Sequence, residues 1–114
     1  MRWNAVASET LSGLHRIDEL YDQPVEDEPG VYLFYKTLNG PVRYVGRADT
    51  KLRRRIAYRG YTYFRYKHIY DETEAYHWEC VYFHRFEDTI ENINHPARPW
   101  GYDELECPCC SPEG

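Results

Sequence analysis

The sequence predicts a small α+β domain in which helices flank a three-stranded, mainly antiparallel sheet. The main observation is a pair of β-branched and aromatic runs at 30–36 and 42–46, separated by Asn39-Gly40. An Asn-Gly pair between two such runs is typical of a β-hairpin turn. A third aromatic run at 61–69 has the composition of another strand. The 114 residues suffice for one domain of this kind.

Two helices are expected beside these strands. The first is basic, begins at Lys51 and should run to about Arg59. Asp49 or Thr50 is a suitable N-cap for it, because both side chains can accept a bond from a free backbone N–H. The second helix is predicted to begin at Thr73 and to run to about Arg85.

We divide the chain into three parts. Residues 1–29 form an N-terminal helix and an acidic linker, residues 30–96 form the core, and residues 97–114 form a Cys-rich tail. The N-terminal helix is predicted because four apolar residues recur at helical spacing: Leu11, Leu14, Ile17 and Leu20. Ser8 or Thr10 would cap its start.

The composition indicates a soluble intracellular protein. No apolar run reaches the length of about eighteen residues that a membrane-spanning helix needs. The N-terminus lacks a basic start followed by an apolar stretch, so no secretory signal is expected. We therefore predict a cytoplasmic location and no membrane partner.

Positive charge is concentrated in one part of the chain. The net charge of −5 would by itself disfavour nucleic acid as a partner. Segment 47–67, however, contains eight cations and one acid, so it carries +7 while the remainder carries −12. A basic patch on an acidic body fits a local phosphate contact better than a protein that coats DNA. A solvated helix face is the alternative explanation.

Gly-Val-Tyr at 30–32 and Tyr-Val-Gly at 44–46 lie in the two strands of the predicted hairpin. They resemble the two tripeptides of the GIY-YIG nuclease domain, with Val in place of the usual Ile. Leu-x-x-Arg-Ile at 52–56 matches the setting of its arginine. Thr-Glu-Ala at 73–75, followed after three residues by Glu79, is similar to the excision-repair incision subunit. The resemblance, which extends to GIY-YIG homing endonucleases, covers residue 30 to about residue 96.

The resemblance implies a metal-dependent endonuclease with a single active site, acting on phosphodiester bonds in DNA rather than RNA. Glu79 would hold Mg²⁺ or Mn²⁺, since Mg²⁺ keeps most of its waters and one carboxylate suffices. Arg55 would hold the scissile phosphate with its planar guanidinium. Tyr32 would be the general base, with its pKa lowered by a nearby cation, and Tyr44 would position the water.

The same pattern implies further contacts to the substrate. Gly46 would let the substrate backbone approach closely, and Arg47 occupies a position that is usually basic and would contact phosphate. Two more substrate-binding candidates lie on the basic helix: Arg54 and Arg59. The late asparagine of the family, which braces the site, corresponds to Asn92 or Asn94, and we favour Asn92.

The cysteines form a second pattern, which is independent of the resemblance. Cys80 and His84 are four residues apart on the second predicted helix and therefore face the same way. Cys107 and Cys110 form a C-x-x-C pair in the tail. Together they make a Cys₃His set, which predicts a structural Zn²⁺ that joins the tail to the helix. Two further residues are spare ligands: His95 and Cys109. Reduced thiols on a mobile tail are the alternative.

Two other functions remain open from the sequence. The chain could be a non-catalytic, zinc-stabilised module that binds nucleic acid through residues 53–59. It could also be an interaction domain whose acidic surface faces a basic protein. The Glu79 carboxylate favours the nuclease, because a module that only binds nucleic acid does not need it. No sequence-reading DNA module is recognised, so a protein partner or a second copy of the chain would direct targeting.

Overall fold

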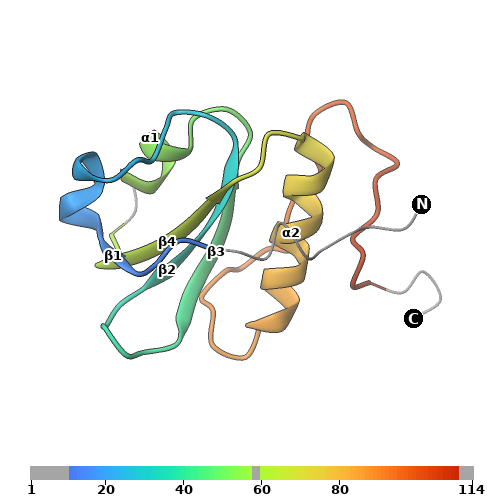
Figure 1. Cartoon of the computed structure of the whole chain (residues 1–114). Coiled ribbons are helices and arrows are strands. Elements are labelled where there is room, and N and C mark those ends of the chain that lie inside the picture. The colour runs from blue at the N-terminus through green and yellow to red at the C-terminus, as the bar shows by residue number, and fades with distance from the viewer. Residues whose placement is uncertain (1–10, 58–59, 111–114) are drawn as a thin grey trace.

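The computed structural model describes residues 11–57 and 60–110 and has a small α+β fold. Its elements, in chain order, are β1 (His15–Arg16), the 3₁₀ helix η2 (Ile17–Asp22), β2 (Gly30–Tyr35), β3 (Val42–Ala48), α1 (Leu52–Ala57), β4 (Tyr63–His68) and α2 (Glu72–Arg85). The strands form one antiparallel sheet in the order β1-β4-β2-β3. Figure 1 shows η2 and α1 on one side of the sheet and α2 on the other, with the C-terminal residues beyond α2.

The predicted hairpin is confirmed. Strands β2 and β3 are antiparallel neighbours, and their register pairs Gly30 with Ala48 and Tyr32 with Gly46. Because β2 is a central strand and β3 is the last strand of the sheet, the outer side of β3 is available to other segments of the chain. The candidate active site is built around this edge.

The third predicted strand is confirmed as β4, and the structure adds a fourth. Strand β4 pairs with the side of β2 that β3 leaves open. The two-residue strand β1 then pairs with β4, with His15 opposite Phe64 and Arg16 opposite Tyr63. The sheet therefore has four strands and not the three that were expected.

The predicted N-terminal helix is wrong over its described part. Residues 15–22 form β1 and the short η2, and Glu19 has non-helical angles inside η2 (φ −107°, ψ 16°). The backbone N–H of Ile17 donates to the carbonyl of Thr62 at 2.9 Å, so the sheet supplies a hydrogen bond that a helix would have made internally. The proposed caps lie outside the described residues: Ser8 and Thr10.

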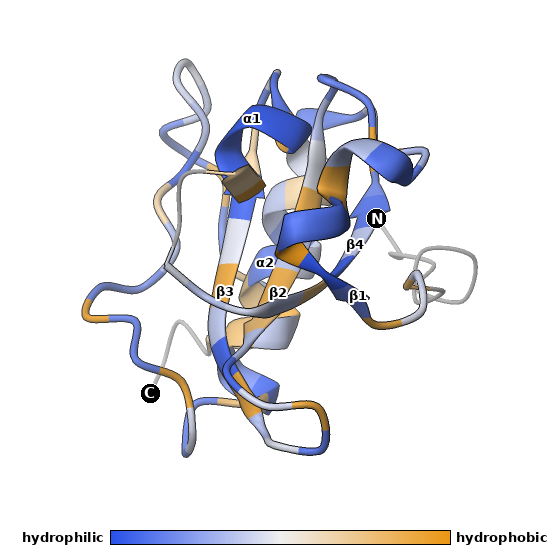
Figure 2. Ribbon diagram, turned by 90° about the vertical axis from the view of Figure 1, so that its left-hand side faces the viewer, coloured by the Kyte–Doolittle hydropathy of each residue, from blue (hydrophilic) through white to orange (hydrophobic). Residues whose placement is uncertain are grey.

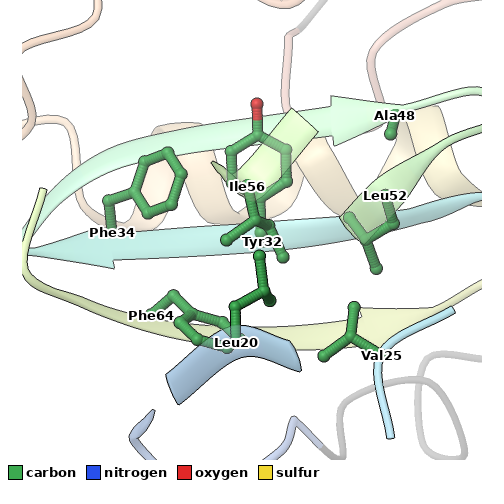
Figure 3. Packing of buried hydrophobic residues seen from close by; sticks show 8 residues of the cluster. All are labelled: Leu20, Val25, Tyr32, Phe34, Ala48, Leu52, Ile56 and Phe64. Carbon is green, nitrogen blue, oxygen red and sulfur yellow. The ribbon is translucent and has the colours of Figure 1, made fainter. Parts of the chain in front are cut away.

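Each face of the sheet buries its own hydrophobic cluster. The cluster on the η2 and α1 side is shown in Figure 3 and contains Leu20, Val25, Tyr32, Phe34, Ala48, Leu52, Ile56 and Phe64. The cluster under α2 contains Val31, Leu33, Val42, Val45, Ile69, Ala75, Trp78 and Tyr82. Along β2, Tyr32 and Phe34 belong to the first cluster, and Val31 and Leu33 belong to the second. Figure 2 shows hydrophobic residues along β2 and mostly hydrophilic residues on α1.

The two helices differ in how closely they match their predicted limits. Helix α2 begins at Glu72, because the carboxylate of Asp71 accepts bonds from the N–H groups of Thr73 (2.8 Å) and Glu74 (3.3 Å). Helix α1 is described only as far as Ala57, so its predicted end lies outside the described residues. Among residues 11–57 and 60–110, no helix is long and apolar enough to cross a membrane.

Candidate active site

A buried ion pair joins β3 to α2. Nη1 of Arg47 lies 2.8 Å from Oε1 of Glu79, and only 9% and 11% of the two side chains are exposed. The same guanidinium donates to Asp49 through Nε (2.7 Å) and to the carbonyl of Ala97 through Nη1 (2.7 Å). The ring of Tyr76 lies 5.6 Å from the guanidinium carbon. Arg47 thus fixes the carboxylate of Glu79, for which the resemblance implies a metal-binding role.

This position differs from the one expected for Arg47. An arginine that contacts DNA needs exposed N–H groups, whereas Arg47 is enclosed and its donors are engaged by groups of its own chain. In this structure Arg47 holds the carboxylate of Glu79. Asp49 was expected only as a helix cap, and the structure also makes it a partner of Arg47. It lies one residue after β3 ends, and the two-residue spacing of the opposite charges was the available signal.

The environment of Glu79 makes the ionised form of its carboxyl group less favourable. Burial is the largest influence and raises the pKa of Glu79 to about 7, and the neighbouring Asp49 adds to the rise. The positive charges of Arg47 and Arg55 act in the opposite direction. A carboxylate with such a pKa is half protonated near neutral pH, so a further cation beside it would favour the ionised form.

The two motif tyrosines lie on the opposite face of the sheet from Arg47. Tyr32 is 1% exposed and belongs to the cluster beneath α1. Its ring packs parallel to the half-buried Tyr44, with 6.4 Å between centroids. Figure 3 shows the ring of Tyr32 crossing β3, with its oxygen directed beyond the strand. The two hydroxyl-bearing rings therefore approach the edge of the sheet from one side and Glu79 from the other.

Gly46 is required by Tyr32. A Cβ atom at this position would lie 2.2 Å from Cζ and 2.3 Å from the hydroxyl oxygen of Tyr32. We expected the glycine to make room for the substrate backbone. The structure shows that it makes room for a side chain of its own chain, which is the cross-strand partner in the β2–β3 register.

A cationic hollow of about 210 Å³ lies where β3 leads into α1. Its lining comprises Ala48, Asp49, Thr50, Lys51, Arg54 and Arg55. Arg53 points elsewhere, since it lies 3.8 Å from Asp27 and its guanidinium is over the ring of Tyr21. The remaining arginine proposed for this helix, Arg59, lies outside the described residues. The structure thus brings Arg54 and Arg55 together and links them to the Arg47–Glu79 pair through Asp49.

Asn92 occupies the outer edge of β3. Its side chain accepts from the N–H of Val45 at 3.0 Å and donates to the carbonyl of Val45 at 2.8 Å, as a neighbouring strand would. Glu91 adds a backbone bond to Arg43 at 2.7 Å. Asn94 is exposed. Of the two candidates, Asn92 is therefore the one placed to brace the strand that carries Arg47.

A cluster of four side chains that could hold a metal ion lies at the other end of α2. It consists of His84, His95, Cys107 and Cys110, whose ligand atoms lie within 4.8 Å of one another. The predicted set is corrected in one member, because Cys80 is not in the cluster. Cys80 is buried one helical turn away against Tyr76 and Cys107, and its short side chain does not extend to the imidazole of His84.

Comparison of the chain with protein-family models, curated proteins and solved structures found no significant match. Any inference about function therefore rests on three arrangements of residues in the structure. They are a buried carboxylate held by an arginine, a hollow lined by cations beside it, and a His/Cys cluster near the C-terminal end of α2.

Proposed function

We propose that the protein is a metal-dependent endonuclease of the GIY-YIG type, which hydrolyses phosphodiester bonds in DNA. The observation that supports this most strongly is the fixed carboxylate of Glu79 beside the cationic hollow of α1. Both lie at the strand that carries the second motif tripeptide. An ion pair that only stabilises the fold would not require exposed cations beside it.

Glu79 fits the metal site of such an enzyme. Arg47 engages Oε1, and within the described part of the chain no hydrogen bond to Oε2 is observed. Mg²⁺ or Mn²⁺ accepts a shell of one carboxylate oxygen, waters and phosphate oxygens. When bound, the ion supplies charge neutralisation at the scissile phosphate. Since Arg47 already offsets the charge of Glu79, the protein by itself should hold the ion weakly, and the phosphate of the substrate should complete the site.

The cations of the hollow would bind the phosphate backbone. Arg54 and Arg55 are exposed, and Lys51 lines the same hollow. A guanidinium presents a planar pair of donors that matches two phosphate oxygens. Arg55 is the cation whose charge also acts on Glu79, so we assign it to the scissile phosphate and the other two to neighbouring phosphates.

Tyr32 would take the proton from the attacking water, and Tyr44 would hold its ring in place. The stacking of the two rings and the close fit of Tyr32 against Gly46 restrict the phenol to one orientation. Asn92 would keep β3, and with it Gly46 and Arg47, at a fixed distance from α2. A fixed geometry of this kind is what positioning and electrostatic catalysis require.

A second function has one observation in its favour. The ion pair with Arg47 gives Glu79 a structural role, so a module that binds nucleic acid without cleaving it could retain this carboxylate. The two functions differ in a direct test. Incubation with Mg²⁺ and branched, nicked and linear DNA, with matched RNA, should yield cleavage products for the nuclease. Binding without cleavage of any substrate in Mg²⁺ or Mn²⁺ would favour the binding module.

A further inference from the structure

Three ligand atoms from three different segments meet beside the C-terminal half of α2. Nε2 of His84, on the helix, lies 3.2 Å from Nε2 of His95, in the following loop. Sγ of Cys110, near the end of the described chain, lies 3.3 Å from the first nitrogen and 3.5 Å from the second. The sulfur of Cys107 completes the group. Segments far apart in sequence thus direct their electron-pair donors at one point.

These separations match the edges of a zinc tetrahedron. With Zn–N near 2.0 Å and Zn–S near 2.3 Å, tetrahedral geometry places two nitrogens about 3.3 Å apart and a nitrogen and a sulfur about 3.5 Å apart. The three measured separations lie within a few tenths of an ångström of those values. A site with two thiols and two imidazoles is a set that Zn²⁺ prefers and that Mg²⁺ and Ca²⁺ do not.

The outer nitrogens of both histidines are also arranged as in a metal site. Nδ1 of His95 lies 3.0 Å from the carbonyl of Pro96, which can only accept, so this nitrogen carries the proton. Nδ1 of His84 lies 3.5 Å from a carboxylate oxygen of Glu87. Both contacts favour the tautomer that leaves Nε2 with its lone pair toward the cluster. Metal-bound histidines typically use their second nitrogen in this way.

We propose that His84, His95, Cys107 and Cys110 bind one Zn²⁺ in a closed, structural site. The ion holds the C-terminal segment against α2, where the apolar contacts are few. The small cluster there contains Tyr76, Cys80 and Cys107, with Leu105 at its margin. Trp100, midway along the segment, is 95% exposed. Closing a loop with a metal is a common way to order such a segment in a small domain.

The zinc site also holds one of the groups that fix Arg47. Ala97, whose carbonyl accepts from Nη1 of Arg47, is two residues after His95. Anchoring His95 therefore keeps this carbonyl in place and, through Arg47, the carboxylate of Glu79. This second role rests on the proposed nuclease function, whereas the metal site itself does not. The tests of the site accordingly use readouts other than cleavage.

The first test is the metal content of protein purified without an affinity tag or chelator. We expect about one zinc per chain, and the Co²⁺-substituted protein should show the visible absorption of a tetrahedral thiolate site. Less than about half a zinc per chain after growth with added zinc, together with four freely reactive thiols, would overturn the proposal.

Variants then test which residues are ligands. His95→Ala and Cys110→Ser should lose most of the zinc, whereas Cys109→Ser is a matched control from the same turn, because Cys109 is exposed and outside the cluster. Cys80→Ala should keep the zinc. Loss of zinc from the Cys80 variant with retention in the His95 variant would overturn this ligand set in favour of the Cys₃His set.

The anchoring role is tested by proteolysis. Trp100 and Tyr102 are exposed and lie within the anchored segment, and neither is followed by proline. Removal of zinc should make chymotrypsin cleave after these two residues at least several times faster, and the same acceleration should appear in His95→Ala but not in Cys109→Ser. An unchanged cleavage rate after zinc removal would show that the metal does not anchor the segment.

Discussion

Arg47 and Glu79 form a buried ion pair that ties the edge strand β3 to α2, with 2.8 Å between Nη1 and Oε1. Neither residue adjoins the other in sequence. The pair exists because β3 packs against α2, and Asp49, just after the end of β3, contacts the same guanidinium. Its energetic role and its proposed chemical role lead to different expectations, which can be measured separately.

Removing Arg47 should destabilise the fold strongly. Arg47→Ala leaves Glu79 buried without its main partner, and breaking a buried pair typically costs about 3–5 kcal/mol. The loss should be smaller at about pH 5, where Glu79 can protonate, than at about pH 8. Urea denaturation at both pH values measures it. Arg54→Ala, which removes an exposed cation, is the control and should change stability by less than about 0.5 kcal/mol.

The raised pKa of Glu79 predicts that stability falls as the pH rises. Between the ordinary value of 4.5 and the folded value of about 7, the folded protein binds more protons than the unfolded chain. The free energy of unfolding should therefore decrease by about 1–3 kcal/mol between about pH 5 and about pH 8. Glu79→Gln should lack this part of the pH dependence. Identical pH profiles for the parent and the variant would contradict the burial of a titrating carboxylate.

Gly46→Ala tests the fit between Tyr32 and β3. The added methyl group would meet the ring within 2.3 Å, so the ring must move, and we expect a loss of about 1–3 kcal/mol. Tyr32→Leu in the same chain should recover part of the loss, because it removes the atoms that clash. Gly13→Ala is the control, since nothing lies near its Cβ position. Additive effects of the Gly46 and Tyr32 substitutions would show that the two sites are not coupled.

Binding to DNA should depend on salt with a shallow slope. The hollow offers three cations, so log K against log salt should have a slope of roughly −2 to −4. Arg54→Ala and Arg55→Ala should each reduce the slope by about one, and Arg53→Ala should change it less because Arg53 faces Asp27. Fluorescence anisotropy with labelled duplexes measures the slope. Affinity that does not change with salt would favour the protein-interaction function.

Local signals predicted the central part of the fold. The two strand-like runs predicted the hairpin, but Asn39-Gly40 does not form a tight two-residue turn: residues 36–41 link the strands, and the N–H of Gly40 donates to the carbonyl of Thr37 at 3.3 Å. The second helix was predicted from Thr73, one residue after its observed start, and the Asp71 cap was not anticipated. The N-terminal segment was wrong because helical spacing of apolar residues competes with the free edge of β4, and the hydrogen bond from Ile17 to Thr62 shows that the edge prevailed. No local sequence pattern predicts that β4 has a free edge with which another segment can pair.

The candidate site was likewise predicted only in part from the sequence. The resemblance proposed Glu79, and the spacing of the cysteines proposed Cys107 and Cys110, but the partners of these residues depend on the tertiary structure. Arg47 was expected to contact phosphate because its position is usually basic in the family that the chain resembles, and it is buried because α2 and Ala97 cover it. His95 replaces Cys80 in the metal cluster because the loop after α2 turns back, which spacing on the helix does not report.

The most direct test of the nuclease proposal compares the parent with Glu79→Gln on DNA. Glutamine keeps an oxygen for the bond from Arg47 and removes the charge that would bind Mg²⁺, so folding and DNA affinity should be retained. We predict Mg²⁺-dependent cleavage by the parent and at least about a hundredfold slower cleavage by the variant, as expected when a metal ligand is lost. Cleavage by Glu79→Gln at the rate of the parent would contradict the assignment of Glu79, and absence of cleavage by the zinc-loaded parent on every DNA substrate would contradict the nuclease function itself.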